Sequence, residues 1–149
     1  IPMLKKNNIS LELCLPEQPT IITTCSSKLA QVITNLVTNA VIHGFPESAN
    51  LTDKTLTFTL KDKKQRIELT ITDNGVGIEE EFLEKLFEPF YTTNRGQGST
   101  GLGLSISQNI LTGALCGNID VSSQVDTGTE FTISLPKYLK GGSTSPVTN

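Results

Sequence analysis

The chain has 149 residues, of which 36% are hydrophobic and 18% are charged, and 12 basic against 15 acidic residues give a net charge of −3. This length and composition are typical of one globular domain with its own core. No segment combines a basic stripe with interleaved aromatic residues, so nucleic acid is not expected as a partner. The three cysteines, Cys14, Cys25 and Cys116, are widely spaced, which predicts neither a disulfide framework nor a zinc site.

The cysteine usage favours a reducing, cytoplasmic environment, and no apolar run reaches the ~20 residues that cross a bilayer. The chain begins with Ile1 and not with methionine, which suggests a fragment of a longer protein. The sequence leaves open whether that parent is anchored to an inner membrane. We expect residues 1–140 to form the domain and residues 141–149, which are poor in apolar side chains, to form a disordered tail.

In the first part of the chain, residues 9–15 alternate apolar and polar side chains, which predicts a half-buried strand, and residues 20–25 suggest a second, short strand. From residue 27 to residue 44 apolar side chains recur every three or four positions, which predicts an amphipathic helix. Ser26 or Ser27 is the expected N-cap, and the helix is expected to end near Gly44.

Residues 55–60 and 66–72 are β-branched, alternating segments around a charged turn, and they predict an antiparallel hairpin. A short acidic helix is expected at 79–86, within a polar segment, 79–100, that is typical of a flap. A further helix is expected at 102–111, followed by strands at 117–123 and 129–135. About five strands, mainly antiparallel, and three helices with apolar faces predict an α+β two-layer sandwich.

Polar side chains follow the predicted long helix at four-residue steps: Gln31, Asn35, Asn39 and His43. Such a row is also typical of a solvent-facing stripe. Exposed helix faces usually carry Lys, Glu and Arg, however, whereas asparagine is a poor helix former and occurs here twice. Because an amide oxygen can coordinate Mg²⁺ beside phosphate oxygens, the row favours a polyphosphate site.

The segment 73–78, Asp-Asn-Gly-Val-Gly-Ile, follows a predicted strand and, taken singly, is typical of a turn. In a functional interpretation, Asp73 accepts a hydrogen bond from the exocyclic amine of adenine, while Gly75 and Gly77 allow the base to approach the backbone. A guanine carbonyl would face the same carboxylate with a second acceptor, so GTP would be rejected.

The segment 98–104, Gly-Ser-Thr-Gly-Leu-Gly-Leu, opens a predicted helix whose free N–H groups suit phosphate oxygens. It lacks the Gly-Lys-Ser/Thr ending of a P-loop and the third glycine of a dinucleotide fingerprint. Thr100 is equally well explained as a helix cap. The aromatic cluster at 87–93 is typical of a plug that anchors a loop.

Together and in this order, these segments resemble the histidine-kinase members of the gyrase, Hsp90, histidine kinase and MutL ATPase superfamily. Residues 35–43 are similar to the N box, residues 73–77 to the first glycine box, residues 87–93 to the F box and residues 100–104 to the second glycine box. The resemblance covers residues 9–136 and implies the Bergerat-type ATP-binding fold, with residues 79–100 as the ATP lid.

The resemblance also implies a site for ATP and Mg²⁺, in which Asn39 binds the metal and Asn35 acts with it. Asp73 would bind adenine, with Thr129 assisting through water, and Arg95 would supply a cation where many members carry lysine at the preceding position, here Asn94. The remaining residues expected to contact nucleotide are His43, Gly75, Gly77, Thr92, Thr93, Gly98, Thr100, Gly101, Leu102, Gly103 and Leu104.

The branches of this superfamily that hydrolyse ATP carry a glutamate at the position of Asn35. Because an amide cannot act as a general base, the resemblance favours phosphoryl transfer over hydrolysis. The implied function is transfer of the γ-phosphoryl group to a histidine on a separate dimerisation domain, with a response regulator downstream in two-component signalling. The fragment, expected to be monomeric, would not phosphorylate itself. The alternatives are a serine kinase of the anti-sigma-factor type and a degenerate nucleotide-sensing module.

Overall fold

The computed structural model describes residues 2–88 and 103–138 of the chain. The elements, in chain order, are α1 (Pro2–Lys6), β1 (Ser10–Cys14), α2 (Ser26–Asn39), the π-helical turn η1 (Ala40–Gly44), the 3₁₀ turn η2 (Glu47–Ala49), β2 (Thr55–Asp62), β3 (Arg66–Asp73), α3 (Glu80–Leu83), α4 (Gly103–Thr112), β4 (Asn118–Gln124) and β5 (Gly128–Pro136). The expected tail at 141–149 lies outside the described residues.

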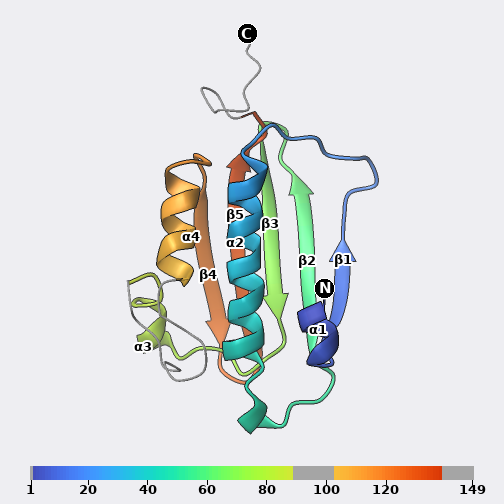
Figure 1. Cartoon of the computed structure of the whole chain (residues 1–149), viewed down its shortest axis with the longest axis vertical. Helices are drawn as coiled ribbons and strands as arrows, with labels where there is room; N and C mark the ends of the chain where they lie inside the picture. Colours follow the sequence, from blue (N-terminus) through green and yellow to red (C-terminus); the bar gives the residue numbers. More distant parts are fainter. Residues whose placement is uncertain (1, 89–102, 139–149) are drawn as a thin grey trace.

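The strands form one five-stranded sheet in the order β1-β2-β3-β5-β4. Only β1 and β2 are parallel, and the other three pairs are antiparallel. Helices α2 and α4 lie side by side on one face of this sheet (Figure 1). The predicted α+β two-layer sandwich with a mixed, mainly antiparallel sheet is therefore confirmed.

The two faces of the sheet differ because side chains alternate along every strand. The face toward the helices carries the core, whose sheet members include Leu56, Ile67, Ile71, Ile119, Phe131, Ile133 and Leu135, packed against Val32, Leu36, Val37 and Leu111 of the helices. The opposite face is rich in threonine and charged residues, and on it Thr70 and Thr132 share a hydrogen bond of 3.3 Å. This is the arrangement of a sheet with one solvated face.

Two expectations about the first part of the chain are wrong. The expected first strand is present as β1, but it is exposed along its whole length and not half-buried, with 42% of Leu11 and 58% of Leu13 accessible, because it is the edge strand farthest from α2 and α4. Residues 20–25 form no strand: the segment lies beyond the end of β5, where Thr23 meets Tyr138 in a single isolated bridge.

The helix boundaries also differ from the expected ones. Cys25, and neither Ser26 nor Ser27, occupies the N-cap of α2, and no side chain caps the helix, because Ser26 is already the first helical residue. The acidic helix at 79–86 is helical only over Glu80–Leu83. The N-terminal helix α1, which was not predicted, is anchored by Leu4, which is only 3% exposed.

Candidate functional site

Asp73 is the last residue of β3, and its carboxyl group is buried at the end of the sheet where β5 begins. The residue is 4% exposed, and one carboxyl oxygen, Oδ1, accepts a hydrogen bond of 2.9 Å from the backbone N–H of Gly75. Burial raises the pKa of Asp73 to about 6, although hydrogen bonds from the backbone of Gly75 and Thr129 oppose the shift. The carboxyl group has no ion-pair partner among the described residues.

The glycines around Asp73 allow backbone segments to come close together. A Cβ atom at Gly75 would lie 1.9 Å from the carbonyl oxygen of Gly44, and one at Gly44 would lie 3.0 Å from the Asp73 carboxyl group. Gly77 has a φ of +76°, and its Cβ position lies 2.1 Å from the carbonyl oxygen of Gln124. Gly75 and Gly77, expected to admit a base, are thus also required by the close packing of the backbone near Asp73.

Gly44 and Gly128 belong to the same close-packed backbone around Asp73, and the sequence did not predict them as site residues. Gly128 has a φ of +139°, and a Cβ atom there would lie 1.9 Å from the backbone oxygen of Asp73. The backbone N–H of Val76 donates to the carbonyl oxygen of Gly44 at 2.9 Å. The signal in the sequence was weak, because a glycine at a helix end or in a hairpin is explained by local turn geometry alone.

The row of polar side chains at four-residue steps along α2 and η1 is partly buried. Gln31 is exposed, whereas Asn35, Asn39 and His43 are intermediate in burial. The Asn35 amide donates to Ser107 Oγ at 3.1 Å and to the carbonyl oxygen of Gly103 at 3.4 Å, both in α4. The middle of the predicted row, at Asn35, therefore faces α4, so the row is not a simple solvent-facing stripe.

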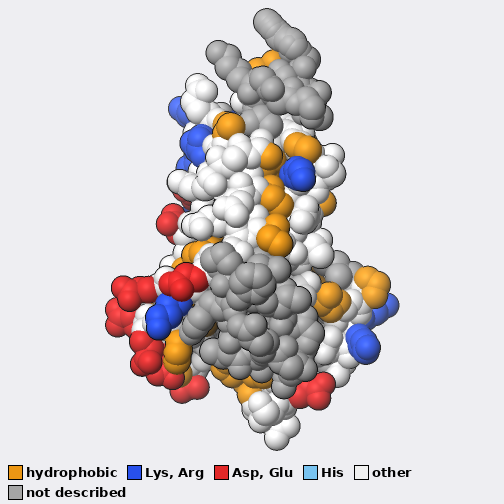
Figure 2. Space-filling model, turned by 60° about the vertical axis from the view of Figure 1, so that its left-hand side comes forward, with side chains coloured by type: hydrophobic (Ala, Val, Ile, Leu, Met, Phe, Trp, Pro, Cys, Tyr) orange, Lys and Arg blue, Asp and Glu red, His pale blue; other side chains and the backbone are white. Residues whose placement is uncertain are grey.

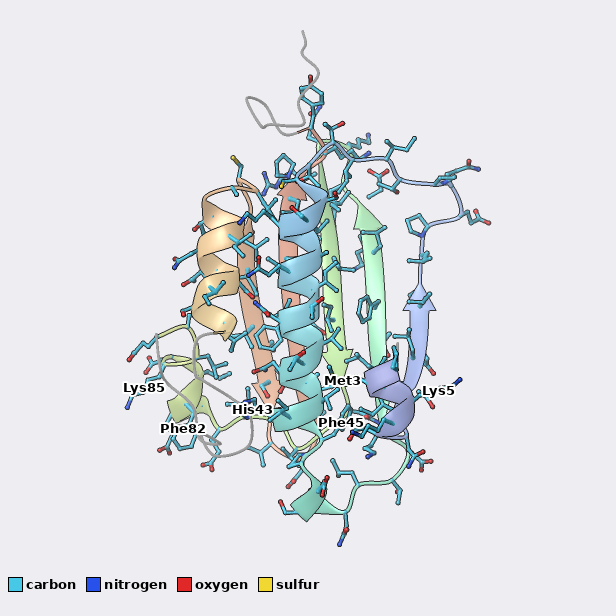
Figure 3. The ribbon with its side chains drawn as sticks, in the orientation of Figure 1. Met3, Lys5, His43, Phe45, Phe82 and Lys85 are labelled. Carbon is cyan, nitrogen blue, oxygen red and sulfur yellow. The ribbon has the colours of Figure 1, made fainter. Side chains whose placement is uncertain are left out.

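The helix changes type just before His43. Residues Ala40–Gly44 form a π-helical turn, in which the N–H of Phe45 reaches the carbonyl oxygen of Ala40 at 3.1 Å. Such turns often occur at functional sites. Figure 3 shows His43 on the side of the helix toward α3, whereas Phe45 lies on the side toward α1. Burial lowers the pKa of His43, so its imidazole is neutral at pH 7.

Asn39 is the last residue of α2, one turn from Asn35, and its side chain makes no hydrogen bond to any described residue. The described residues contain no group of three His, Cys, Asp or Glu side chains that would hold a metal ion alone. A hard cation here would therefore depend on an amide oxygen such as that of Asn39 and on oxygens of a bound phosphate. This donor set suits Mg²⁺, which retains water and phosphate ligands.

Helix α4 begins with Gly103 beside the middle of α2, and among the described residues nothing lies within 4 Å of a Cβ atom added at Gly103. The N–H groups of a helix start and its partial positive charge favour anions. Leu104, expected to contact nucleotide, is also a core residue that is 9% exposed. Seven further site residues lie outside the described residues: Thr92, Thr93, Arg95, Gly98, Thr100, Gly101 and Leu102.

Thr129 lies opposite Asp73 in the register of β3 and β5 and is 5% exposed. Its hydroxyl lies 2.8 Å from Ser123 Oγ in the neighbouring strand β4. The elements β3, α2, η1 and β5 thus meet at one end of the molecule, the lower end in Figure 3. They carry Asp73, Asn39, His43 and Thr129, respectively. The sequence predicted these residues, but Ser123 and Ser107, which contact members of the site, were missed.

On the side of the molecule that carries α4, Lys and Arg side chains are scattered, and hydrophobic side chains form a narrow vertical strip (Figure 2). No helix among residues 2–88 and 103–138 is both long and apolar enough to span a membrane.

Known proteins share this fold and these motifs. A sequence profile described as histidine kinase-, DNA gyrase B- and HSP90-like ATPase matches residues 24–139. The catalytic domain of histidine kinase ThkA superposes with a TM-score of 0.77 at 28% identity, over 92% of this chain and 84% of that domain. ThkA in complex with response regulator protein TrrA gives a TM-score of 0.71 at 26% identity, over 91% of this chain and 36% of that chain.

The chain belongs to the family of histidine kinase-, DNA gyrase B- and HSP90-like ATPases. Within it, the chain is similar to sensor histidine kinases: Sporulation kinase D of Bacillus subtilis (strain 168) is 37% identical over 130 residues. That alignment covers 87% of this chain and 24% of the Bacillus protein, so the chain spans about a quarter of that relative's length.

Proposed function

We propose that this chain binds ATP with Mg²⁺ and that, within a complete sensor kinase, it presents the γ-phosphoryl group to a histidine on a separate dimerisation domain. The observation that carries the proposal is the Asp73 carboxyl group, which is buried with no cation beside it among the described residues and has a raised pKa. A protein tolerates such a group at a cost in stability, and functional sites are where this cost is commonly found.

Each described residue of the site would bind a different part of the nucleotide, according to the chemistry of its side chain. Above its pKa of about 6, Asp73 is an acceptor, which suits the exocyclic amine of adenine and not the carbonyl oxygen of guanine. Asn39 offers an amide oxygen to the cation, which when bound would neutralise charge on the phosphates. The start of α4 at Gly103 offers N–H groups to phosphate oxygens. The neutral His43 can donate one N–H without adding charge.

Asn35 supports transfer over hydrolysis. It donates its amide N–H to Ser107 and Gly103 in α4, and an amide cannot take a proton from water as a glutamate would. Seven residues outside the described part of the chain would complete the phosphate side of the site: Thr92, Thr93, Arg95, Gly98, Thr100, Gly101 and Leu102. Catalysis would then come from positioning and charge neutralisation. The complex of the related ThkA with TrrA supports a response regulator as the downstream partner.

Calorimetry tests the binding proposal directly. We expect the chain to bind ATP with Mg²⁺ and to bind GTP far more weakly under the same conditions. No heat of ATP binding would reject the nucleotide site and favour a degenerate module that serves only as a binding partner.

The transfer proposal needs an acceptor. A histidine-bearing helical domain from the same kinase, mixed with this chain and radiolabelled ATP, should acquire acid-labile phosphate. Acid-stable phosphate on the partner would instead assign the chain to the serine-kinase class.

A further inference from the structure

Ser123 lies in β4 directly opposite Thr129 of β5, and its hydroxyl oxygen contacts three polar groups. The backbone N–H of Ile78 donates to it at 2.8 Å, the carbonyl oxygen of Gly128 lies at 2.9 Å, and Thr129 Oγ1 lies at 2.8 Å. Ser123 thereby joins the segment that follows Asp73 to the β4–β5 hairpin. None of these contacts was predicted from the sequence, because Ile78 lies 45 residues before Ser123 in the chain and the register of β4 and β5 sets the contacts with Gly128 and Thr129.

The number of protons in this cluster fixes its hydrogen-bond directions. A serine hydroxyl has one proton to donate and two lone pairs. The Gly128 carbonyl can only accept, so it takes the Ser123 proton, while the Ile78 N–H occupies one lone pair. The contact with Thr129 is then a hydrogen bond only if Thr129 donates to the second lone pair of Ser123.

This direction determines what Thr129 offers to a ligand. With its proton committed to Ser123, the Thr129 oxygen has only lone pairs left, so it is an acceptor. The ionised carboxylate of Asp73, which is paired with Thr129 in register and accepts a hydrogen bond from the Thr129 backbone, is also an acceptor. A nucleobase edge that meets both groups must supply N–H donors.

We propose that Ser123 is a positioning residue for nucleobase selection: by holding the Thr129 proton, it makes Thr129 a second acceptor beside Asp73 and strengthens the preference for a 6-amino over a 6-oxo purine. This inference rests on the proposed ATP site. It adds a residue that is not expected to touch the nucleotide itself. Without the Ser123 oxygen, the Thr129 hydroxyl is free to rotate and to donate to a 6-oxo group.

The test compares the dissociation constants of ATP and ITP, each with Mg²⁺, for the chain and its variants by competition calorimetry. ITP carries a carbonyl oxygen where ATP carries the amine, and the two nucleotides have the same sugar and phosphates. In Ser123→Ala we expect the ratio of the ITP to the ATP dissociation constant to fall by about tenfold, which is the scale of one hydrogen bond. Ser123→Thr, which keeps a hydroxyl, should retain the ratio.

Ser122→Ala is the matched control, because Ser122 is the preceding residue of β4 but is exposed on the opposite face of the sheet. It should leave both dissociation constants unchanged. If Ser123→Ala shows no cooperative thermal unfolding, Ser123→Cys replaces it, since a thiol of similar size is a poor acceptor and should lower the ratio in the same way.

Two results would contradict the inference, and they have different meanings. If Ser123→Ala weakens both nucleotides by the same factor, Ser123 only supports the hairpin, and the proposed function is unaffected. If the unmodified chain binds no ATP, the proposed function fails and the inference fails with it.

A double variant separates the two roles further. In a Thr129→Val background, which has no hydroxyl to orient, adding Ser123→Ala should leave the ITP to ATP ratio unchanged. A further fall of tenfold in that background would show that Ser123 acts by another route, and this would also overturn the inference.

Discussion

Two aspartates end adjacent strands at opposite ends of the sheet, and their surroundings differ in every respect. Asp62, the last residue of β2, is exposed and pairs with Lys137 at 2.6 Å. The hydrogen bond from Lys137, followed by one from the backbone of Lys64, lowers the pKa of Asp62. Asp73, the last residue of β3, is buried with no cation beside it in the described part of the chain, and burial raises its pKa to about 6.

The comparison distinguishes a structural carboxylate from a functional one. At the Asp62 end, charge is neutralised locally and water remains available to both partners, so little energy is at stake. At the Asp73 end, the folded chain bears the cost of burying a charge that no side chain of residues 2–88 and 103–138 neutralises. A ligand that brings hydrogen-bond donors to Asp73 recovers part of that cost on binding.

The largest expected effect is on ATP affinity. Asp73→Asn places an amide where the adenine amine needs an acceptor, and hydrogen bonds to charged groups contribute roughly 1.5–3 kcal/mol. We therefore expect ATP to bind about 100-fold more weakly, as measured by calorimetry at pH 7.5. Asp62→Asn, at the other end of the sheet, should bind ATP like the unmodified chain. Equal affinities for the two variants would remove the distinction between the two aspartates.

The next largest effect is a loss of stability on substitution of Gly75, one of the close-packed glycines near Asp73. Gly75→Ala places a methyl group 1.9 Å from the Gly44 carbonyl oxygen, where backbone has to move. Overpacking of this kind typically costs about 1–3 kcal/mol, which urea unfolding would measure. Gly103→Ala is the control, because among the described residues nothing beyond its own helix lies within 4 Å of the added carbon. Since alanine favours helix, this variant should be as stable as the original chain or more stable.

The pH dependence of stability follows from the raised pKa of Asp73. The folded state holds this proton more tightly than the unfolded chain does, so the stabilisation is complete below about pH 4, is lost as the pH rises through about 6, and is absent at pH 8. The difference in unfolding free energy between the chain and Asp73→Asn should change by about 2 kcal/mol between pH 4.5 and pH 8. A difference independent of pH would show that Asp73 has an ordinary pKa.

The same titration affects ligand binding. Below pH 6 the protonated Asp73 is a weaker acceptor, so the affinity for ATP should fall as the pH is lowered from 7 to 5. Calorimetry across this range, with Asp73→Asn as the insensitive reference, measures the effect. A constant ratio of the two affinities would exclude Asp73 from binding the base.

The smallest expected effect concerns the Lys137–Asp62 pair. The pKa of Asp62 is lowered in the folded state, so its contribution is present at neutral pH and is lost on acidification. Because both partners are partly exposed, Lys137→Met should shift thermal unfolding only slightly at pH 7, and less in 0.5 M salt than at low ionic strength. A large, salt-independent loss would make this end of the sheet as critical as the Asp73 end.

Much of the fold was accessible from the sequence because local periodicity decides it. The three-to-four-residue repeat of α2 and the alternation of β2 and β3 predicted these elements correctly. Prediction failed where distant segments intervene. The residues around Thr23 have strand-like composition, but no free strand lies beside them among the described residues. The π-helical turn that contains His43 depends on how Gly44 packs against Val76 and Asp73.

For the site, the sequence determined which chemical groups are present and in what order: the amides of α2, the carboxylate of Asp73 at a strand end and a helix that follows a glycine-rich segment. The tertiary structure alone decided their state. Asp73 is buried without a cation among the described residues, and the direction of the Ser123–Thr129 hydrogen bond depends in part on Ile78, which lies 45 residues before Ser123 in the chain. Desolvation and hydrogen-bond direction are properties of an assembled environment, so no local pattern of residues can encode them by itself.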